Sequence, residues 1–129
     1  LTVPFFTVVL RKAYGLGAQG MAGGGFHAPL FAVSWPTGEF GGMGLEGAIK
    51  LGYRNELAAI ADPAERRALY EKMVARMYAQ GKAINAASLF ELDDVIDPAE
   101  TRNWIMGALR AQPPIPPRTG KKRPAIDAW

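Results

Sequence analysis

The 129-residue chain contains no cysteine, and its only histidine is His27. Without a thiol, the sequence offers no disulfide framework, thiolate zinc site, iron–sulfur cluster or cysteine nucleophile. With one imidazole, it offers no multi-histidine metal site, and a serine triad or histidine acid–base pair has no spare partner. We therefore expect no metal site, and any catalysis must rely on other groups.

Long apolar runs are also missing. Pro4, Arg11, Pro29 and the glycines interrupt the N-terminal half before the ~18 consecutive apolar residues that a membrane helix needs. The segment that starts at Leu1 lacks the basic residues that open a signal peptide. We therefore expect neither a membrane span nor a secretory signal.

The formal net charge of +3 comes from one end of the chain. Residues 110–129 sum to +4, whereas the remainder sums to −1. No stripe of basic side chains with interleaved aromatics occurs elsewhere, so we expect no nucleic-acid partner. Composition instead predicts a folded part over residues 1–112 and a Pro-rich basic tail over 113–129. The charged residues of this C-terminal segment are Arg110, Arg118, Lys121, Lys122, Arg123 and Asp127.

The second half of the sequence is helical in pattern. The tetrapeptide Asp-Pro-Ala-Glu occurs twice, at 62–65 and 97–100, and each copy supplies an Asp N-cap, a first-turn Pro and a Glu at the capping-box position. Apolar residues at helical spacing follow the first copy to Gly81 and the second to Pro113. We expect both helices to pack against a core or a partner subunit.

The first half reads as strands separated by glycine. Residues 1–10 are rich in β-branched side chains and predict a buried strand, and residues 30–33 and 40–43 predict two more. Residues 45–57 predict a helix, and residues 94–96 a short strand. This order of elements is typical of an α/β fold.

Glycine is concentrated between residues 15 and 52, which hold 12 of the 15 glycines. The segment 15–20 matches G-x-G-x-x-G, follows a predicted strand and enters a predicted helix. One interpretation is a dinucleotide site, with Glu39 on a ribose hydroxyl. Against it, residues 11–14 separate the strand from the turn, and Glu39 follows Trp-Pro-Thr-Gly rather than ending a second strand.

Two other interpretations of this turn stay open. Free backbone N–H groups at the start of a helix stabilise any developing anion, including an enolate oxygen. Alternatively the glycines serve only a tight turn, and the chain is a non-catalytic assembly subunit whose helical stripes make oligomer contacts.

Three blocks of the sequence carry a resemblance to a known family. The chain resembles the C-terminal part of the carboxyltransferase (beta) subunit of biotin-dependent acyl-CoA carboxylases over residues 3–110. The blocks are Val-Val-Leu-Arg-Lys-Ala-Tyr-Gly (8–15) with Gly17-Ala18, Trp-Pro-Thr-Gly-Glu (35–39) running into Met-Gly-Leu-Glu-Gly-Ala (43–48), and Asp-Asp-Val-Ile-Asp-Pro (93–98) with Thr101-Arg102.

The resemblance implies a crotonase-like fold, of which this chain would form the C-terminal half of the second carboxyltransferase domain. It implies carboxyl transfer from carboxybiotin to the α-carbon of an acyl-CoA, with enolates held by backbone amides. By this resemblance, the backbone amides of Gly17 and Ala18 would form the catalytic oxyanion hole. The cofactor-binding residues implied are Tyr14, Gly15, Gly17, Ala18 and Gln19, with no metal.

The resemblance also implies partners. They are a biotin carboxyl carrier, a biotin carboxylase subunit, the acyl-CoA and further copies of the chain in a hexamer, in the cytoplasm or, in a eukaryote, the mitochondrial matrix. Because the family's site lies between domains of different subunits, the fragment alone is expected to be inactive. One departure concerns the turn itself, where Leu16 separates Gly15 from Gly17 as an apparent one-residue insertion.

Overall fold

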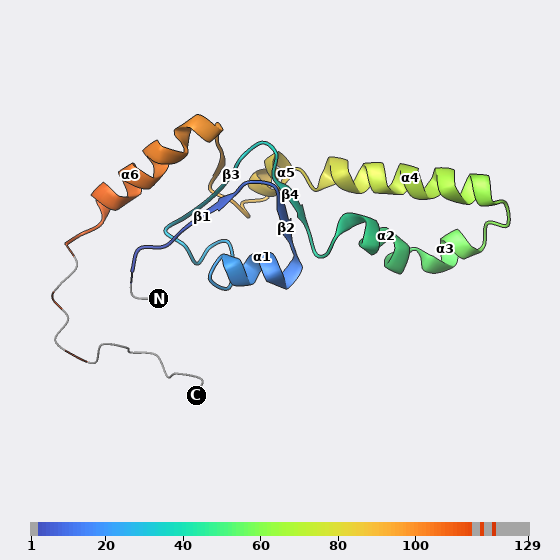
Figure 1. Cartoon of the computed structure of the whole chain (residues 1–129), viewed down its shortest axis with the longest axis horizontal. Coiled ribbons are helices and arrows are strands. Elements are labelled where there is room, and N and C mark those ends of the chain that lie inside the picture. Colours follow the sequence, from blue (N-terminus) through green and yellow to red (C-terminus); the bar gives the residue numbers. More distant parts are fainter. Residues whose placement is uncertain (1–2, 115–116, 118–119, 121–129) are drawn as a thin grey trace.

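The computed structural model describes residues 3–114, 117 and 120. Figure 1 shows a region of strands that carries α1 and α6, and a hairpin of helices, α2 to α4, that extends away from it. The elements are β1 (Phe6–Val9), β2 (Lys12–Tyr14), α1 (Gly15–Met21), β3 (Phe31–Ser34), β4 (Glu39–Gly41), α2 (Leu45–Gly52), α3 (Arg54–Ala58), α4 (Pro63–Gln80), α5 (Ala83–Ser88), β5 (Asp94–Val95), η1 (Pro98–Glu100) and α6 (Thr101–Ala111).

All the described strand pairs are parallel. The larger sheet has the order β1-β3-β5, with Phe6 opposite Phe31 and Val33 opposite Asp94. A separate pair joins β2 to β4, with Tyr14 opposite Gly41. Parallel neighbours require crossover connections, which the helices supply. The expected α/β class is therefore confirmed as a mixed α/β fragment with parallel sheets.

The core lies on both faces of β3, whose four residues are all buried. On one face, Phe31 and Val33 join Ile96, and Trp104 of α6 meets Phe31 edge to face at 5.5 Å between ring centroids. On the other face, Ala32 packs with Ala86 of α5 and with Leu92, since alternate strand residues point in opposite directions. Burial on both faces explains why this strand reads as a continuous apolar run.

The helical hairpin has a thinner core. Leu45 and Ile49 of α2 are buried, whereas α4 contains no fully buried residue. The predicted stripe of α4, from Leu69 to Tyr78, is half-buried along the side that packs on α2. The helix begins as expected, because the carboxylate of Asp62 accepts the N–H of Ala64 at 3.1 Å.

The second Asp-Pro-Ala-Glu copy forms a different start. Asp97 again accepts an N–H, from Ala99 at 2.8 Å, but the next turn is the 3₁₀ helix η1, and α6 follows it. The predicted capping-box role of Glu100 is wrong, because its carboxylate accepts the side-chain amide of Asn103 at 2.9 Å. The same tetrapeptide thus caps an α-helix at Asp62 and a 3₁₀ helix at Asp97, and α6 itself begins at Glu100 without a side-chain cap.

Four other expectations need correction. The helix predicted over residues 45–57 is divided into α2 and α3 at Tyr53, directly after Gly52, which disfavours helix. Of the described residues of the first predicted strand, 3–10, only Phe6–Val9 form β1, and only Val9 in it is buried. The third predicted strand lies at 39–41 rather than 40–43. The elements β2 and α5 were not expected, because segments of three to six residues carry little periodicity.

In the C-terminal segment, the structure describes only four residues after Gln112. Residues Pro113, Pro114, Pro117 and Gly120 lie in neither helix nor strand. The basic and acidic residues of the predicted tail, at 118, 121–123 and 127, lie outside the described residues. Over the described residues, no helix has both the length and the apolar character to span a membrane.

Candidate functional site

The glycine-rich turn lies at the end of β2, where the chain enters α1. Tyr14 is extended, with φ −114° and ψ 130°, and Gly15 has φ +57°. The helix α1 begins at Gly15, with Tyr14 as its N-cap, and Gly15 itself has a left-handed φ. The N–H groups of Gly15, Leu16 and Gly17 belong to the first turn, whose amides have no helical carbonyl one turn back, and Ala18 is the first residue that has one, at Tyr14.

The turn is held by a close approach of two backbones. A Cβ atom on Gly15 would lie 2.6 Å from the carbonyl oxygen of Gly42, which follows β4. The left-handed φ of Gly15 independently disfavours any side chain. Pairing of β2 with β4 brings the two glycines together, so a side chain is excluded at Gly15 for two separate reasons.

Two cavities flank the first turn of α1. The larger, about 530 Å³, is lined by the continuous stretch 7–14 and by Gly17, Ala18, Met21 and Phe26. The smaller, about 330 Å³, is lined on the α1 side by Gly15, Ala18 and Gln19. Ala18 therefore borders both cavities, and a Cβ atom on Gly17 would meet no atom within 4 Å.

The structure brings together the residues that the resemblance singles out. Tyr14, Gly15, Gly17, Ala18 and Gln19 occupy one turn, and each lines one or both of the two cavities. The apparent insertion of Leu16 leaves α1 uninterrupted, since this residue continues the helix and is 85% exposed.

A carboxylate fixes the phenol that precedes the turn. The Tyr14 hydroxyl donates to Glu39 Oε2 at 2.8 Å, and Arg11 Nε lies 3.9 Å from the other carboxylate oxygen. Burial raises the pKa of the Tyr14 hydroxyl well above its ordinary value of 10.0, and the hydrogen bond to Glu39 raises it further. Tyr14 thus stays protonated at neutral pH and acts as a hydrogen-bond donor.

The position of Glu39 disfavours the dinucleotide interpretation. Glu39 lies opposite Lys12, at the start of β4, whereas the turn follows the C-terminal end of β2. A ribose-binding carboxylate would be needed at the C-terminal end of a neighbouring strand. Its oxygens are instead engaged by Tyr14 and Arg11.

The larger cavity also holds a polar atom without a partner. Thr7 Oγ1 is buried and has no hydrogen-bond partner among the described residues. Thr7 lines this cavity together with the apolar Val8 and Val9 and the exposed Arg11 and Lys12. A buried hydroxyl normally finds a partner, so this atom is available to a group that enters the cavity.

Other polar side chains do not form a second centre. His27 is exposed in the loop after α1. Within the part of the chain that the structure describes, no group of three or more His, Asp or Glu side chains is close enough to hold a metal ion. The chemistry available at the turn is therefore that of backbone amides and a neutral phenol.

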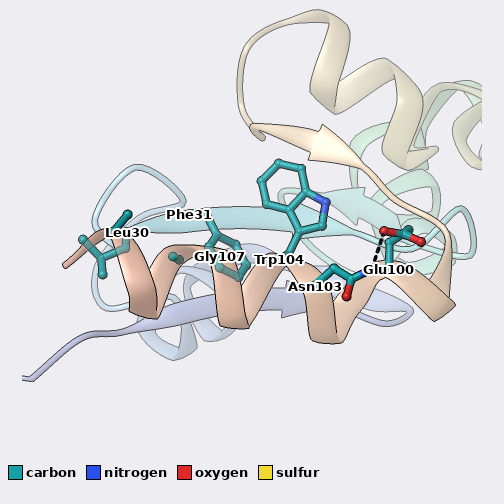
Figure 2. A pocket seen from close by; sticks show the side chains of 8 residues that line it. Leu30, Phe31, Glu100, Asn103, Trp104 and Gly107 are labelled. Carbon is teal, nitrogen blue, oxygen red and sulfur yellow. Dashed lines mark hydrogen bonds between the residues drawn. The ribbon is translucent and has the colours of Figure 1, made fainter.

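A third cavity, of about 530 Å³, lies between α6 and β3 (Figure 2). It shares no lining residue with the cavities at α1. Phe31, Trp104 and Leu30 make it apolar, and its two polar side chains, Asn103 and Glu100, bond to each other. Because its two polar side chains bond to each other, this cavity presents a mainly apolar surface and no free polar side chain for catalysis.

Sequence reasoning missed how the turn is supported. The Gly42 carbonyl and the Tyr14–Glu39 hydrogen bond were not foreseen, and both depend on the pairing of β2 with β4. The available signal was the Gly41-Gly42 pair 26 residues after Gly15, because such a pair is typical of a close backbone approach.

Comparison with known proteins gives consistent matches. Residues 1–122 match the family described as "Carboxyl transferase domain". The chain is 43% identical over 108 residues to the methylmalonyl-CoA carboxyltransferase 12S subunit of Propionibacterium freudenreichii subsp. shermanii, a match that covers 84% of this chain and 20% of that subunit.

Two solved structures are also similar. One, of a single-chain, multi-domain long-chain acyl-CoA carboxylase, is 58% identical with a TM-score of 0.70, over 84% of this chain and 10% of the other. Another, of the hexameric transcarboxylase 12S core with methylmalonyl-CoA and methylmalonic acid bound, is 33% identical with a TM-score of 0.72, over 96% of this chain and 24% of the other.

The chain spans about a fifth of the length of the curated relatives that it matches. The family match nevertheless covers most of the chain, and the similarity in sequence agrees with the similarity in fold. The chain belongs to the carboxyl transferase domain family, and it is homologous to the carboxyltransferase subunits of propionyl-CoA carboxylase and transcarboxylase.

Proposed function

We propose that this chain contributes one side of the active site of a biotin-dependent acyl-CoA carboxylase. The reaction is carboxyl transfer from carboxybiotin to the α-carbon of an acyl-CoA. The observation that carries the proposal is the first turn of α1, where Gly17 and Ala18 lie between two cavities in a chain of this family. Their N–H groups would stabilise negative charge on an enolate-like oxygen.

The chemistry suits the residues present. Backbone N–H groups at a helix start carry partial positive charge and need no reorganisation when an anion forms. Gly17 and Ala18 bring at most a methyl group beside the amides, so an oxygen can approach closely. Loss of one such donor typically costs ~3 kcal/mol of transition-state stabilisation. A site of this kind functions without cysteine and without a histidine base.

The implied cofactor fits this turn. First-turn amides and an open space beside Gly17 support a bound group that carries an oxygen with negative charge. Tyr14, Gly15, Gly17, Ala18 and Gln19 would hold it. Biotin, when bound, supplies the carboxyl group that is transferred. The chain itself would orient that group.

The domain assignment belongs to the same proposal. Residues 1–112 would form the later part of a crotonase-like second domain, and residues 113–129 a basic tail. Because the solved transcarboxylase 12S core is a hexamer, we infer that several copies assemble here too. The other proposed partners are a biotin carboxyl carrier and a biotin carboxylase subunit. The rest of the active site would come from other domains.

The comparisons favour a long acyl chain. Identity is 58% to the long-chain acyl-CoA carboxylase and 33–43% to the transcarboxylase 12S relatives. The larger cavity is lined near Ala18 by apolar side chains, among them Met21 and Phe26. A long-chain acyl-CoA is therefore the substrate class that we propose first, and propionyl-CoA the second.

The test is carboxylation by the complete protein that carries this chain. The protein is incubated with a biotinylated carrier, biotin carboxylase, ATP, bicarbonate and acyl-CoAs of increasing chain length. We expect carboxylated product, with the largest kcat/KM for long chains. Absence of product from every acyl-CoA would contradict the proposed reaction, and a preference for propionyl-CoA would contradict only the chain-length proposal.

Two controls separate the other interpretations. A dinucleotide module predicts that NAD(H) quenches tryptophan fluorescence, and we expect no quenching. A non-catalytic assembly subunit predicts that Ala18→Pro leaves carboxylation unchanged in a folded, assembled protein. Because proline has no N–H to donate, we expect this variant to assemble and to lose activity.

A further inference from the structure

We propose that Glu39 is a positioning residue for carboxyl transfer. It holds the Tyr14 phenol, and through it the β2–α1 turn, so that the amides of Gly17 and Ala18 face the two cavities. This inference rests on the proposed function, because it assigns a second residue to the same site.

The argument begins with what Glu39 touches. One carboxylate oxygen accepts the Tyr14 hydroxyl at 2.8 Å, and the other lies 3.9 Å from Arg11 Nε. The Glu39 side chain is only 23% exposed, whereas that of Arg11 is 72% exposed. An exposed ion pair contributes little, so the hydrogen bond to Tyr14 is the stronger constraint.

Glu39 lines neither of the two cavities at α1. Tyr14 lines the larger one, and it is the residue directly before the left-handed Gly15. A carboxylate outside the cavities is not placed to touch a ligand there. Glu39 therefore acts through Tyr14 and not as a catalytic base.

A positioning residue must itself be fixed, and Glu39 is. Its N–H donates to the carbonyl of Arg11, the residue directly before β2, at 2.7 Å. On its other side, Phe40 N–H donates to the Gly81 carbonyl at 2.6 Å, which ties β4 to the end of α4. The β4 backbone is thus held by hydrogen bonds at Glu39 and at Phe40. The Glu39 side chain then sets the position of Tyr14.

The second support of the turn is Gly42, which directly follows Gly41, the residue opposite Tyr14. The Gly42 carbonyl packs against the Cα of Gly15 and prevents the turn from moving toward β4. The Glu39 hydrogen bond prevents Tyr14 from rotating away from β4. Together they define the direction of the first-turn amides, which is the property that oxyanion stabilisation requires.

The chain contains a matched control for this hydrogen bond. Tyr78 of α4 donates to the carboxylate of Glu46 on α2, so it forms the same kind of pair. Neither residue lines a cavity at α1. Tyr78 and Glu46 act on Tyr14 only through longer-range electrostatics and bond neither to it nor to Glu39, so loss of the Tyr78–Glu46 bond should affect the hairpin far more than the turn.

The experiment compares Glu39→Ala, Glu39→Gln, Tyr14→Phe and Tyr78→Phe in the complete protein. Carboxylation kinetics are normalised to the folded fraction. We expect kcat to fall about tenfold in Glu39→Ala and Tyr14→Phe, with KM for acyl-CoA within about twofold of wild type. Glu39→Gln should recover most of kcat, because its amide oxygen still accepts the phenol. Tyr78→Phe should leave kcat unchanged.

Hydrogen exchange provides a readout that does not depend on turnover. The amides of residues 19–21, which bond within α1 to carbonyls of the first turn, should exchange faster in Glu39→Ala and Tyr14→Phe than in wild type, and at the wild-type rate in Glu39→Gln and Tyr78→Phe.

Two kinetic results would overturn the inference. One is unchanged kcat in Glu39→Ala and Tyr14→Phe with lowered stability, which indicates a merely structural bond. The other is equal loss in Glu39→Gln and Glu39→Ala, which assigns the effect to the charge beside Arg11. If wild type carboxylates no acyl-CoA, the proposed function fails, and the exchange rates alone then decide whether Glu39 orders the turn.

Discussion

The strand region and the helical hairpin of this chain are built in different ways. In the strand region, backbone meets backbone: β2 pairs with β4, and the Gly42 carbonyl contacts Gly15 directly. In the hairpin, α2 and α4 meet through side chains, and no residue of α4 is fully buried. Backbone contact fixes atomic positions more tightly than partly exposed packing does. The candidate site lies where the backbone is most constrained.

The sharpest way to test this comparison is to add one methyl group to each region. Gly15→Ala places a Cβ 2.6 Å from the Gly42 carbonyl at a left-handed φ. We expect it to lower the free energy of unfolding by about 3 kcal/mol. In α2, Gly47→Ala meets no atom within 4 Å and should raise the free energy of unfolding by about 0.5 kcal/mol. Urea unfolding of both variants measures the difference, and equal effects would refute it.

The next test compares a large side chain from each region. Trp104→Ala removes the edge-to-face contact with Phe31 and opens the core beside Ile96. We expect a loss of about 3 kcal/mol in the free energy of unfolding. Met73→Ala in the half-buried stripe of α4 should cost about 1 kcal/mol. Thermal unfolding ranks the two, and a larger effect at Met73 would contradict a thinner hairpin core.

The two Asp-Pro-Ala-Glu copies allow a finer comparison. Asp62→Ala and Asp97→Ala each remove one side-chain acceptor from a helix start. Each should cost about 1 kcal/mol in the free energy of unfolding. The consequence should differ, because α6 packs on the core through Trp104 and α4 does not. Hydrogen exchange should show local opening of α4 in the first variant and a change in global unfolding in the second.

The smallest expected effect is the pH dependence of the hairpin. The hydrogen bond from Tyr78 holds the pKa of Glu46 below its ordinary value of 4.5, and the same bond raises the pKa of Tyr78 above 10.0. The pair therefore stabilises the folded state between these pH values. The contribution is lost as pH falls through the lowered pKa of Glu46, and again as it rises through the raised pKa of Tyr78.

Tyr78→Phe is the variant that checks this dependence. It should lower the unfolding temperature slightly near neutrality and by less below pH 4.5 and above pH 10, so that the pH profile becomes flatter. An unaltered pH profile would show that another group sets it.

The difference between the regions also explains what the sequence could predict. The Asp caps and the stripe of α4 were found because helix starts and helical periodicity are local properties. The β2–β4 pair was not found, because three-residue strands carry almost no pattern and their pairing joins residues about 27 positions apart. The buried strand β3 was found, since burial on both faces leaves a continuous apolar run.

The same limit applies to the candidate site. Gly15, Gly17 and Ala18 were identified by spacing and by resemblance, and the structure places them in one turn between two cavities. Gly42 and Glu39 support the turn through contacts with residues far away in the sequence, and no local motif encodes such contacts. The residues that we propose for the chemistry were therefore easier to identify from the sequence than the residues that we propose to position them.

The most direct test of the account removes a single N–H group. In the complete protein, Gly17, whose N–H has no helical carbonyl, is replaced by its α-hydroxy analogue, which converts the amide to an ester and adds no side chain. We predict that kcat for carboxylation falls by about 10²-fold or more, with KM for acyl-CoA nearly unchanged. A folded ester variant with wild-type kcat would contradict the assignment of this amide to the stabilisation of negative charge.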